Sequence, residues 1–385
     1  MFNERYRKKL LIRKEAGLLR IPAVIEGREG KYVFIGTKRV LNFASNDYLG
    51  LGVSEKLRQK VSCNFQKLGT SSSSSRLVSG NYEVISQAEE AYARYFGYQS
   101  ALFFSSGYQA NLALLSTLFE KGDSLIFDKR IHASSIKGME LSGASFRGYN
   151  HNSMSHLRRR LEGNGEGQSA VITESLFSMD GDFLDIDGFG MLKDRFGFFS
   201  VVDEAHAFGA LGEGGRGIAR GVADIAVGTF GKSLGLFGAF VLLPETIKEY
   251  LFNFSSPLIY STTLPEAHAA SALDILEILS EADDMRKRLG EISRIMKESL
   301  CAEGLAVKGD GHIISWEIGD EKAAVEMSRE LLVRDIFVVP VRYPTAPLGK
   351  AIIRIGMTAL HTEEDVKFFL ESLKCIRGKT ELINE

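Results

Sequence analysis

The sequence has few cysteines, little net charge and no long hydrophobic run, and each shortage excludes a class of protein. Cys63, Cys301 and Cys375 stand far apart without metal-ligand spacing, which favours reduced thiols over a disulfide framework or a zinc site. A formal net charge of −2 gives no electrostatic reason to expect nucleic acid or an anionic membrane as a partner. No window is apolar enough to span a bilayer, and the charged residues 1–13 do not resemble a signal peptide. We therefore expect a soluble cytoplasmic protein.

From residue 82 onward, short apolar runs alternate with helical patterns. The predicted strands are 101–104, 124–127, 170–173, 198–202, 225–227 and 239–243. The predicted helices between them include 109–120, 134–142, 155–162 and 187–195. This alternation indicates an α/β fold with a mostly parallel sheet covered by helices on both faces. In such sheets, ligands bind at the carboxyl ends of the strands.

Regions of other character flank this alternating part. Residues up to about 20 are basic with a helical pattern, which is typical of a solvated helix face, and residues 31–43 could form a hairpin turning at Gly36-Thr37. A long helical pattern over 264–279 precedes a charged segment, 281–288, that marks a boundary. Beyond it we expect helices 289–303, 322–334 and 362–373 and strands 312–317, 336–341 and 351–355. The expected organisation is an N-terminal segment (1–50), a large domain (51–283) and a smaller C-terminal α+β domain (284–385).

One lysine lies in a loop of small residues directly after a predicted strand. The stretch Gly228 to Gly235 follows the apolar run 225–227 and contains Lys232. Glycines let the backbone turn tightly and approach a ligand, and a desolvated lysine there could lose its proton and form a Schiff base with a carbonyl. A surface lysine in a flexible turn is the alternative.

The run Val201 to His206 places Asp203 at the end of another predicted strand. A carboxylate in a site of low dielectric constant could hold a protonated ring nitrogen. An aspartate that caps the following segment is the alternative. The pattern also resembles a Walker-B or helicase box, but the sequence contains no G-x-x-x-x-G-K-[ST] motif. A nucleotide-binding module built on the lysine loop, without covalent chemistry, is the hypothesis of another class.

Two further strand-to-helix junctions carry polar residues. Residues 105–108 join a strand to a helix N-terminus, where free amides and the helix dipole could bind a phosphate, although ordinary capping explains the same pattern. Thr229 offers a hydroxyl to the same anion. His132 begins the next junction, where capping and function are both open. A phosphate site, an aspartate for a ring nitrogen, a histidine and a Schiff-base lysine together suit pyridoxal phosphate.

Several motifs resemble one family in their order along nearly the whole chain. They are residues 42–51 (NFASNDYLGL), 76–81 (RLVSGN), 104–111 (FSSGYQAN), 173–182 (TESLFSMDGD), 203–206 (DEAH), 228–238 and 259–265 (IYSTTLP). With these motifs the chain resembles the α-oxoamine synthase family of fold-type I pyridoxal-phosphate transferases. The resemblance implies a large domain with a mostly parallel, seven-stranded-type sheet.

The resemblance also implies residue roles. Lys232 would bind the cofactor covalently and transfer protons, and Asp203 would pair with the pyridinium nitrogen. The remaining expected cofactor contacts are His132 stacked on the ring, Ser178 and His206 at its phenolic oxygen, and Gly107, Tyr108 and Thr229 at the phosphate, joined by Ser261 and Thr262 from the neighbouring subunit of a homodimer. The expected substrate contacts are Arg20, Asn46, Thr345 and Arg354, the last with the amino-acid carboxylate. No metal is expected.

The implied reaction is the decarboxylative condensation of an amino acid with an acyl thioester, carried by coenzyme A or a carrier protein. We expect L-alanine and a pimeloyl thioester, a step of biotin synthesis. Ala205 matches the oxononanoate and sphingoid-forming branches better than those making aminolevulinate or aminoketobutyrate, and the context Tyr260-Ser261-Thr262 favours the oxononanoate branch. Sibling reactions with glycine, serine or another small amino acid, including α-aminoketone signal formation, are the alternative. Residues 70–75 read TSSSSS where the family usually has a glycine-rich run. By resemblance this loop lies near the substrate, so the difference bears mainly on which acyl chain the enzyme prefers.

Overall fold

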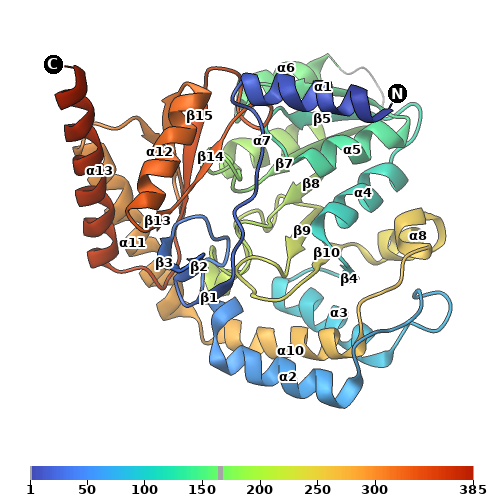
Figure 1. Ribbon diagram of the computed structural model, residues 1–385. Coiled ribbons are helices and arrows are strands. Elements are labelled where there is room, and N and C mark those ends of the chain that lie inside the picture. Colours follow the sequence, from blue (N-terminus) through green and yellow to red (C-terminus); the bar gives the residue numbers. More distant parts are fainter. Residues whose placement is uncertain (1, 164–167, 385) are drawn as a thin grey trace. The chain divides into compact units, whose positions relative to one another are not determined.

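The chain divides into two compact units in the computed structural model, which describes residues 2–163 and 168–384 (Figure 1). The smaller unit contains Met1–Gly50, Met179–Asp182 and Lys287–Glu385, and the larger unit contains Leu51–Ser178 and Phe183–Arg286. Residues 1–50, for which we predicted a segment of their own, thus belong to the same unit as the C-terminal residues. The break between the units near residue 286 falls inside the charged segment 281–288 and inside helix α11 (Asp283–Ala302).

The large unit contains a seven-stranded sheet with the strand order β4-β10-β9-β8-β7-β5-β6. Its strands are β4 (Ser100–Phe104), β5 (Ser124–Asp128), β6 (Ser145–Tyr149), β7 (Ser169–Glu174), β8 (Phe199–Asp203), β9 (Ile225–Thr229) and β10 (Ala239–Leu243). β10 runs antiparallel to both of its neighbours, and the other six strands of this sheet run parallel to one another. The predicted mostly parallel sheet of seven-stranded type is therefore confirmed.

Apolar clusters cover both faces of this sheet. Neighbouring residues in a strand point to opposite faces, so Leu125 and Ile126 contribute to different clusters. Helices α4 (Gly107–Thr117) and α5 (Ala133–Ser142) pack on the first cluster, and α6 (Met154–Glu162) and α7 (Ile186–Phe196) on the second. The unit also contains α2 (Glu55–Leu68), α3 (Glu83–Phe96), α8 (Glu245–Phe254), α9 (Ser256–Ile259), α10 (Glu266–Ser280) and the short 3-10 helices Leu51–Val53 and Glu213–Gly215.

The small unit holds two four-stranded sheets, ordered β1-β2-β3-β13 and β11-β12-β15-β14. Its strands are β1 (Gly27–Glu29), β2 (Tyr32–Ile35), β3 (Lys38–Asn42), β11 (Val307–Lys308), β12 (Ile313–Gly319), β13 (Ile336–Phe337), β14 (Val339–Val341) and β15 (Ala351–Gly356). Its remaining helices are α1 (Phe2–Glu15), α12 (Glu321–Val333) and α13 (Glu363–Asn384). The pairing of Ile35 with Lys38 confirms the predicted hairpin turn at Gly36-Thr37, and α1 buries none of its residues, as expected of a solvated helix.

One strand prediction in this unit is wrong. Residues 336–341 form two short strands: β13 pairs with β3, whereas β14 pairs with β15 in the other sheet. Pro340 has no backbone N–H and is tolerated in β14 because this strand lies at the edge of its sheet. In the described part of the chain, no helix has an apolar stretch long enough to cross a bilayer.

Candidate active site

Three neighbouring strands of the large unit end in polar residues at the carboxyl edge of the sheet. β7 ends at Glu174, β8 at Asp203 and β9 at Thr229. Glu174 pairs with Asp203 in the parallel register, and Asp203 pairs with Val227. The helices α4 and α5 begin a few residues after β4 and β5, which are parallel to these strands. The strand-end location predicted for the site residues is therefore present in this unit.

Lys232 lies in an ordered loop after β9. The Phe230 N–H donates to the Gly238 carbonyl and the Leu236 N–H to the Phe230 carbonyl, both at 2.9 Å. The Nζ of the half-buried Lys232 lies 2.8 Å from His206 Nε2. This geometry does not support the alternative of a lysine in a flexible turn.

The hydroxyl of Thr229 stabilises the same loop. It donates to the Gly238 carbonyl at 2.9 Å and accepts from the Gly231 N–H at 3.1 Å. Gly235 has φ +70°, and a Cβ atom there would lie 2.5 Å from the Gly52 backbone nitrogen, so this turn requires glycine. The predicted phosphate contact of Thr229 stays a prediction, since its hydroxyl is engaged within the loop.

Asp203 receives hydrogen bonds on both carboxylate oxygens. Asn111 Nδ2 donates to Oδ2 at 3.0 Å and the Ala205 N–H donates to Oδ1 at 2.9 Å. The bond from the Ala205 N–H is the capping contact that we considered as an alternative. The bond from Asn111, a residue of α4, orients the carboxylate. Asn111 also donates to Ser134 Oγ at 3.0 Å. Asn111 belongs to a motif of the sequence analysis but received no predicted role.

His132 is the N-cap of α5. Its Nδ1 accepts from the Ser134 N–H at 3.3 Å and lies 2.7 Å from Ser134 Oγ. Burial lowers the pKa of His132, and the charge of Lys232 acts in the same direction, while Asp203 opposes it. The capping interpretation is therefore correct, and the same ring is close enough to Asp203 and Lys232 to sense their charges.

The start of α4 offers free backbone donors. Ser106 caps the helix by accepting from the Gln109 N–H at 3.2 Å, which leaves the N–H groups of Gly107 and Tyr108 at the first two helical positions. Gln109 Nε2 donates to Ser261 Oγ at 2.8 Å, so Ser261 lies beside the first turn of α4 in its own chain, and its expected contact in the neighbouring subunit stays a prediction. A helix N-terminus with such donors suits a phosphate group.

Glu174 and Ser178 complete the cluster at the strand ends. The Ser178 N–H donates to Glu174 Oε2 at 3.3 Å. Glu174 is fully buried, and its pKa is raised to about 8, chiefly by burial and then by the charge of Asp203, against the opposing charge of Lys232. Sequence reasoning assigned no role to Glu174, although it lies in a quoted motif.

The small unit brings two of the predicted substrate residues together and, at another point, the other two. Arg354 Nη2 donates to Asn46 Oδ1 at 3.0 Å and to Tyr48 Oη at 3.2 Å. Arg20 Nη2 donates to Thr345 Oγ1 at 3.1 Å. Burial raises the pKa of the Tyr48 phenol, and Arg354 opposes this shift, so Tyr48 stays a neutral partner of the guanidinium.

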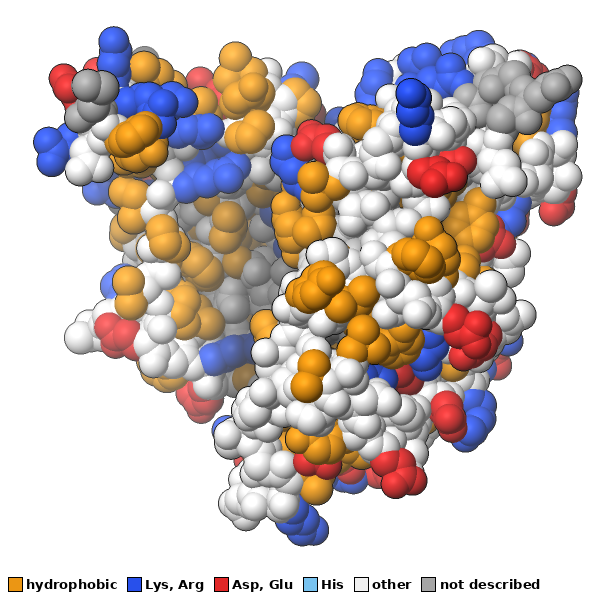
Figure 2. All heavy atoms as spheres, turned by 90° about the vertical axis from the view of Figure 1, so that its right-hand side faces the viewer, with side chains coloured by type: hydrophobic (Ala, Val, Ile, Leu, Met, Phe, Trp, Pro, Cys, Tyr) orange, Lys and Arg blue, Asp and Glu red, His pale blue; other side chains and the backbone are white. Residues whose placement is uncertain are grey.

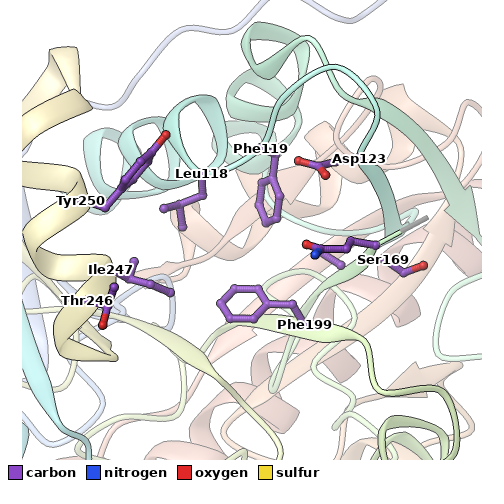
Figure 3. Close-up of a pocket in the computed structure, with 10 residues that line it drawn as sticks. Leu118, Phe119, Asp123, Ser169, Phe199, Thr246, Ile247 and Tyr250 are labelled. Atoms are coloured by element: carbon purple, nitrogen blue, oxygen red, sulfur yellow. The ribbon is translucent and has the colours of Figure 1, made fainter. Parts of the chain in front are cut away.

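A pocket of about 370 Å³ in the large unit lies at the amino ends of the strands, opposite the carboxyl ends that carry the candidate site (Figure 3). Ser169 and Phe199, the first residues of β7 and β8, line it together with Phe119 and Tyr250. The rings of Phe119 and Phe199 meet edge to face with their centroids 6.5 Å apart. Because these residues start the strands that Glu174 and Asp203 end, this pocket is separate from the candidate site.

Comparisons with known proteins agree on one family. Residues 38–373 match the family model of aminotransferase class I and II. The 8-amino-7-oxononanoate synthase of Geotalea daltonii is 37% identical over 363 residues, which cover 92% of this chain and 92% of that protein. The synthase of the same name from Fervidobacterium nodosum is 34% identical over 381 residues, which cover 96% of each chain.

Solved structures give the same result. A serine palmitoyltransferase from S. paucimobilis, with a bound PLP–myriocin aldimine, has a TM-score of 0.90 and 27% identity, covering 96% of this chain and 97% of that chain. The 8-amino-7-oxononanoate synthase from Francisella tularensis has a TM-score of 0.77 and 32% identity, covering 90% and 99%. The fold is thus that of the fold-type I transferases, and the chain belongs to the aminotransferase class I and II family and, within it, to the α-oxoamine synthases.

Proposed function

We propose that this chain is an 8-amino-7-oxononanoate synthase, which joins L-alanine to a pimeloyl thioester with loss of carbon dioxide as a step of biotin synthesis. The observation that carries the proposal is the cluster of Lys232, His206 and Asp203 at one sheet edge. This cluster occurs in a chain that aligns over 92% of its length with a synthase of that name. The relatives and solved structures reported above are named as synthases and transferases, and they do not support the alternative of a nucleotide-binding module.

The residues at the sheet edge fit pyridoxal phosphate as the cofactor. The N–H groups of Gly107 and Tyr108 would hold its phosphate at the start of α4. Asp203 would pair with the ring nitrogen through a carboxylate already oriented by Asn111. When bound, the cofactor supplies a carbonyl for Lys232 and a cationic ring that delocalises an electron pair from the α-carbon of the amino acid.

The remaining cofactor contacts are proposed on the same resemblance. His132 would stack on the ring in its neutral form, because burial lowers its pKa. Ser178 and His206 would reach the phenolic oxygen. His206 would also have a second role, because its Nε2 lies 2.8 Å from Lys232 Nζ and can exchange a proton with it.

Proton transfer is the main task of Lys232 during the reaction. Its neutral amine removes the α-proton of L-alanine, and the α-carbon then attacks the thioester carbonyl and expels the thiol. The carboxyl group leaves as carbon dioxide, and the α-carbon takes up a proton before the product is released. We propose that Arg354, held by Asn46 and Tyr48, binds the alanine carboxylate in a bidentate manner, and that Arg20 and Thr345 contact the acyl substrate.

Incubation with amino acids and acyl thioesters tests this function. Wild-type protein loaded with pyridoxal phosphate is expected to turn yellow and to convert L-alanine and pimeloyl-CoA or pimeloyl carrier protein into 8-amino-7-oxononanoate, identified by mass. Borohydride should fix the cofactor on Lys232, and Lys232→Ala should abolish both the label and turnover. Turnover undiminished in Lys232→Ala contradicts the proposal.

A sibling reaction is the second candidate, because a serine palmitoyltransferase has a TM-score of 0.90 with this chain. The same incubation therefore includes glycine and L-serine, with acetyl-CoA and palmitoyl-CoA as acyl donors. Product formed with L-serine and palmitoyl-CoA, but not with L-alanine, would favour this candidate. The panel of donors also distinguishes coenzyme A from a carrier protein.

We also propose a homodimer with shared sites. Tyr260 is 83% exposed, directly before Ser261 and Thr262, and Phe254 at the end of α8 is 63% exposed. Figure 2 looks onto the side of the molecule that carries α8 and shows apolar side chains on its surface. Light scattering measures the oligomer, and mixing inactive Lys232→Ala with inactive Thr262→Ala should restore activity if the residues act in opposite subunits. A cytoplasmic location stays a prediction.

A further inference from the structure

Glu174 is a second carboxyl group at the sheet edge that holds Asp203, and the proposed reaction does not use it. It is the last residue of β7 and pairs with Asp203 in the parallel register of β7 and β8. Paired residues on adjacent strands project from the same face of the sheet, and adjacent strands lie about 4.8 Å apart. The two carboxyl groups therefore share one environment.

The hydrogen bonds of these two groups are unequal. Asp203 accepts from Asn111 Nδ2 at 3.0 Å and from the Ala205 N–H at 2.9 Å. Glu174 accepts at 3.3 Å from the Ser178 N–H, and its Oε1 is buried without a hydrogen-bond partner of normal geometry among the described residues. Donors stabilise an ionised carboxylate, so the negative charge is better accommodated on Asp203.

The charges around Glu174 lead to the same assignment. Its pKa is raised to about 8 by burial and by the charge of Asp203. Lys232 opposes this shift, as do the backbone N–H groups of Ser178 and His132. Two carboxylates this close do not both ionise readily, and burial without strong donors selects the one that keeps its proton.

We propose that Glu174 is a positioning residue of the cofactor site that stays protonated in the working enzyme, so that Asp203 carries the negative charge of the pair. When Glu174 loses its proton, a second negative charge appears beside Lys232 and increases the proton affinity of the lysine nitrogen. The inference deepens the proposed function and rests on it, since it concerns how the same site distributes its charge. It assigns to Glu174 no contact with substrate.

The variant Glu174→Gln keeps the shape of the side chain and cannot ionise. Unfolded glutamate loses its proton near pH 4.5, whereas folded Glu174 loses it near pH 8. The folded state therefore binds one proton more between these values, so wild-type protein loses stability relative to the variant as the pH rises, and the difference becomes constant above about pH 8. Urea denaturation of the protein without cofactor, at steps from about pH 4 to about pH 9, measures this difference. Parallel curves for the two proteins contradict the inference.

The cofactor-loaded protein gives a second measurement. A pH titration of its visible absorbance reports the protonation of the nitrogen that joins Lys232 to the cofactor. Below about pH 8 the proposed Glu174 is uncharged, so Glu174→Gln should leave the midpoint of this titration unchanged there. An ionised Glu174 would instead place a negative charge near Lys232 and hold the wild-type midpoint roughly one to two pH units above that of the variant. A midpoint that is lower by that amount in Glu174→Gln, at a pH below about 8, overturns the inference.

Glu204→Gln is the matched control. Glu204 is also fully buried with a raised pKa, chiefly because of burial, but it accepts hydrogen bonds from Ser175 Oγ and from the Ile218 and Ala219 N–H groups. Its substitution should change the stability profile and leave the absorbance midpoint in place. A protein that takes up no cofactor contradicts the proposed function instead, and the denaturation profiles then still decide whether Glu174 holds a proton.

Discussion

Replacing Glu89 by alanine is expected to lower the free energy of unfolding of the large unit by about 3–5 kcal/mol. The Glu89 side chain is fully buried and accepts from Arg76 Nη1 at 2.7 Å and Nη2 at 3.3 Å. It also accepts from the Phe103 N–H at 2.9 Å, and Lys248 Nζ lies 3.2 Å away. The Arg76 side chain is only 3% exposed, so alanine at position 89 leaves a buried guanidinium without its carboxylate.

Two further variants separate the loss of charge from the loss of packing. Glu89→Gln keeps an acceptor for Arg76 and Phe103 but removes the charge, and we expect a loss of about 2 kcal/mol. The double variant Arg76→Met with Glu89→Leu removes both members of the pair and refills the space with apolar atoms. Such replacements are often neutral, so the loss of stability in the double variant should be much smaller than the sum of the losses in Arg76→Met alone and Glu89→Leu alone. Lys248 is 17% exposed and can reach solvent in that variant.

Urea denaturation of the wild type, these three variants and the single variants Arg76→Met and Glu89→Leu, under one set of conditions, measures these differences. Equal slopes of the free energy against urea would show that the mutations change stability and leave the surface exposed on unfolding unchanged. A Glu89→Ala protein within about 1 kcal/mol of wild type would refute the reasoning, as that loss is typical of an exposed pair. A double variant as unstable as the sum of the single variants would show that the charges do not act as a pair.

Three smaller predictions concern other parts of the chain. Tyr48→Phe removes the hydrogen bond that the Tyr48 oxygen accepts from the Arg354 guanidinium and should raise KM for L-alanine about 5- to 20-fold with little change in kcat, measured by steady-state kinetics. Gly217→Ala, at φ +79° with the new Cβ 2.6 Å from Glu204, should destabilise the protein by about 2 kcal/mol or more in thermal unfolding. Burial lowers the pKa of His268 to about 4, so wild-type stability should fall between about pH 6.5 and pH 4 more steeply than that of His268→Gln; equal slopes would contradict this.

In the seven-stranded sheet, the strands that the sequence predicts have mostly buried residues on both faces. Every residue of β4 and β10 is buried, and such strands appear as continuous apolar runs. β6, at the edge of the sheet, was missed because four of its five residues, in the sequence S-F-R-G-Y, are exposed or half-buried. The run 336–341 was predicted as one strand because composition cannot show that a chain changes partners between two sheets.

The sequence predicted those residues of the candidate site whose location depends only on the strand or turn that contains them. Lys232 and Asp203 directly follow or end buried strands, so their place at the carboxyl edge followed from the alternating pattern. Asn111 and Glu174 depend on geometry that no local pattern contains. Asn111 reaches Asp203 because of the rotation of α4 about its axis, and the environment of Glu174 depends on the register between β7 and β8. Both residues look like ordinary polar positions in the sequence.

The conformation of the serine run at residues 71–75 shows how serines occupy this loop, where the resemblance led us to expect a glycine-rich stretch. Ser73 is the only one of the five with a positive φ, at +55°, so the loop needs the left-handed conformation at one position. The hydroxyl of Ser72 donates to the Thr263 carbonyl at 2.8 Å, and the Thr263 N–H donates to the Ser74 carbonyl at 3.0 Å. The Ser72 hydroxyl thus holds the loop against Thr263, the residue that follows Ser261 and Thr262, whereas glycine would leave the loop backbone more flexible. Because that segment is proposed to complete the neighbouring subunit's site, a glycine at position 72 should loosen both stretches, and limited proteolysis within residues 70–81 should become faster. An unchanged cleavage rate would mean that the hydroxyl contact does not hold the loop.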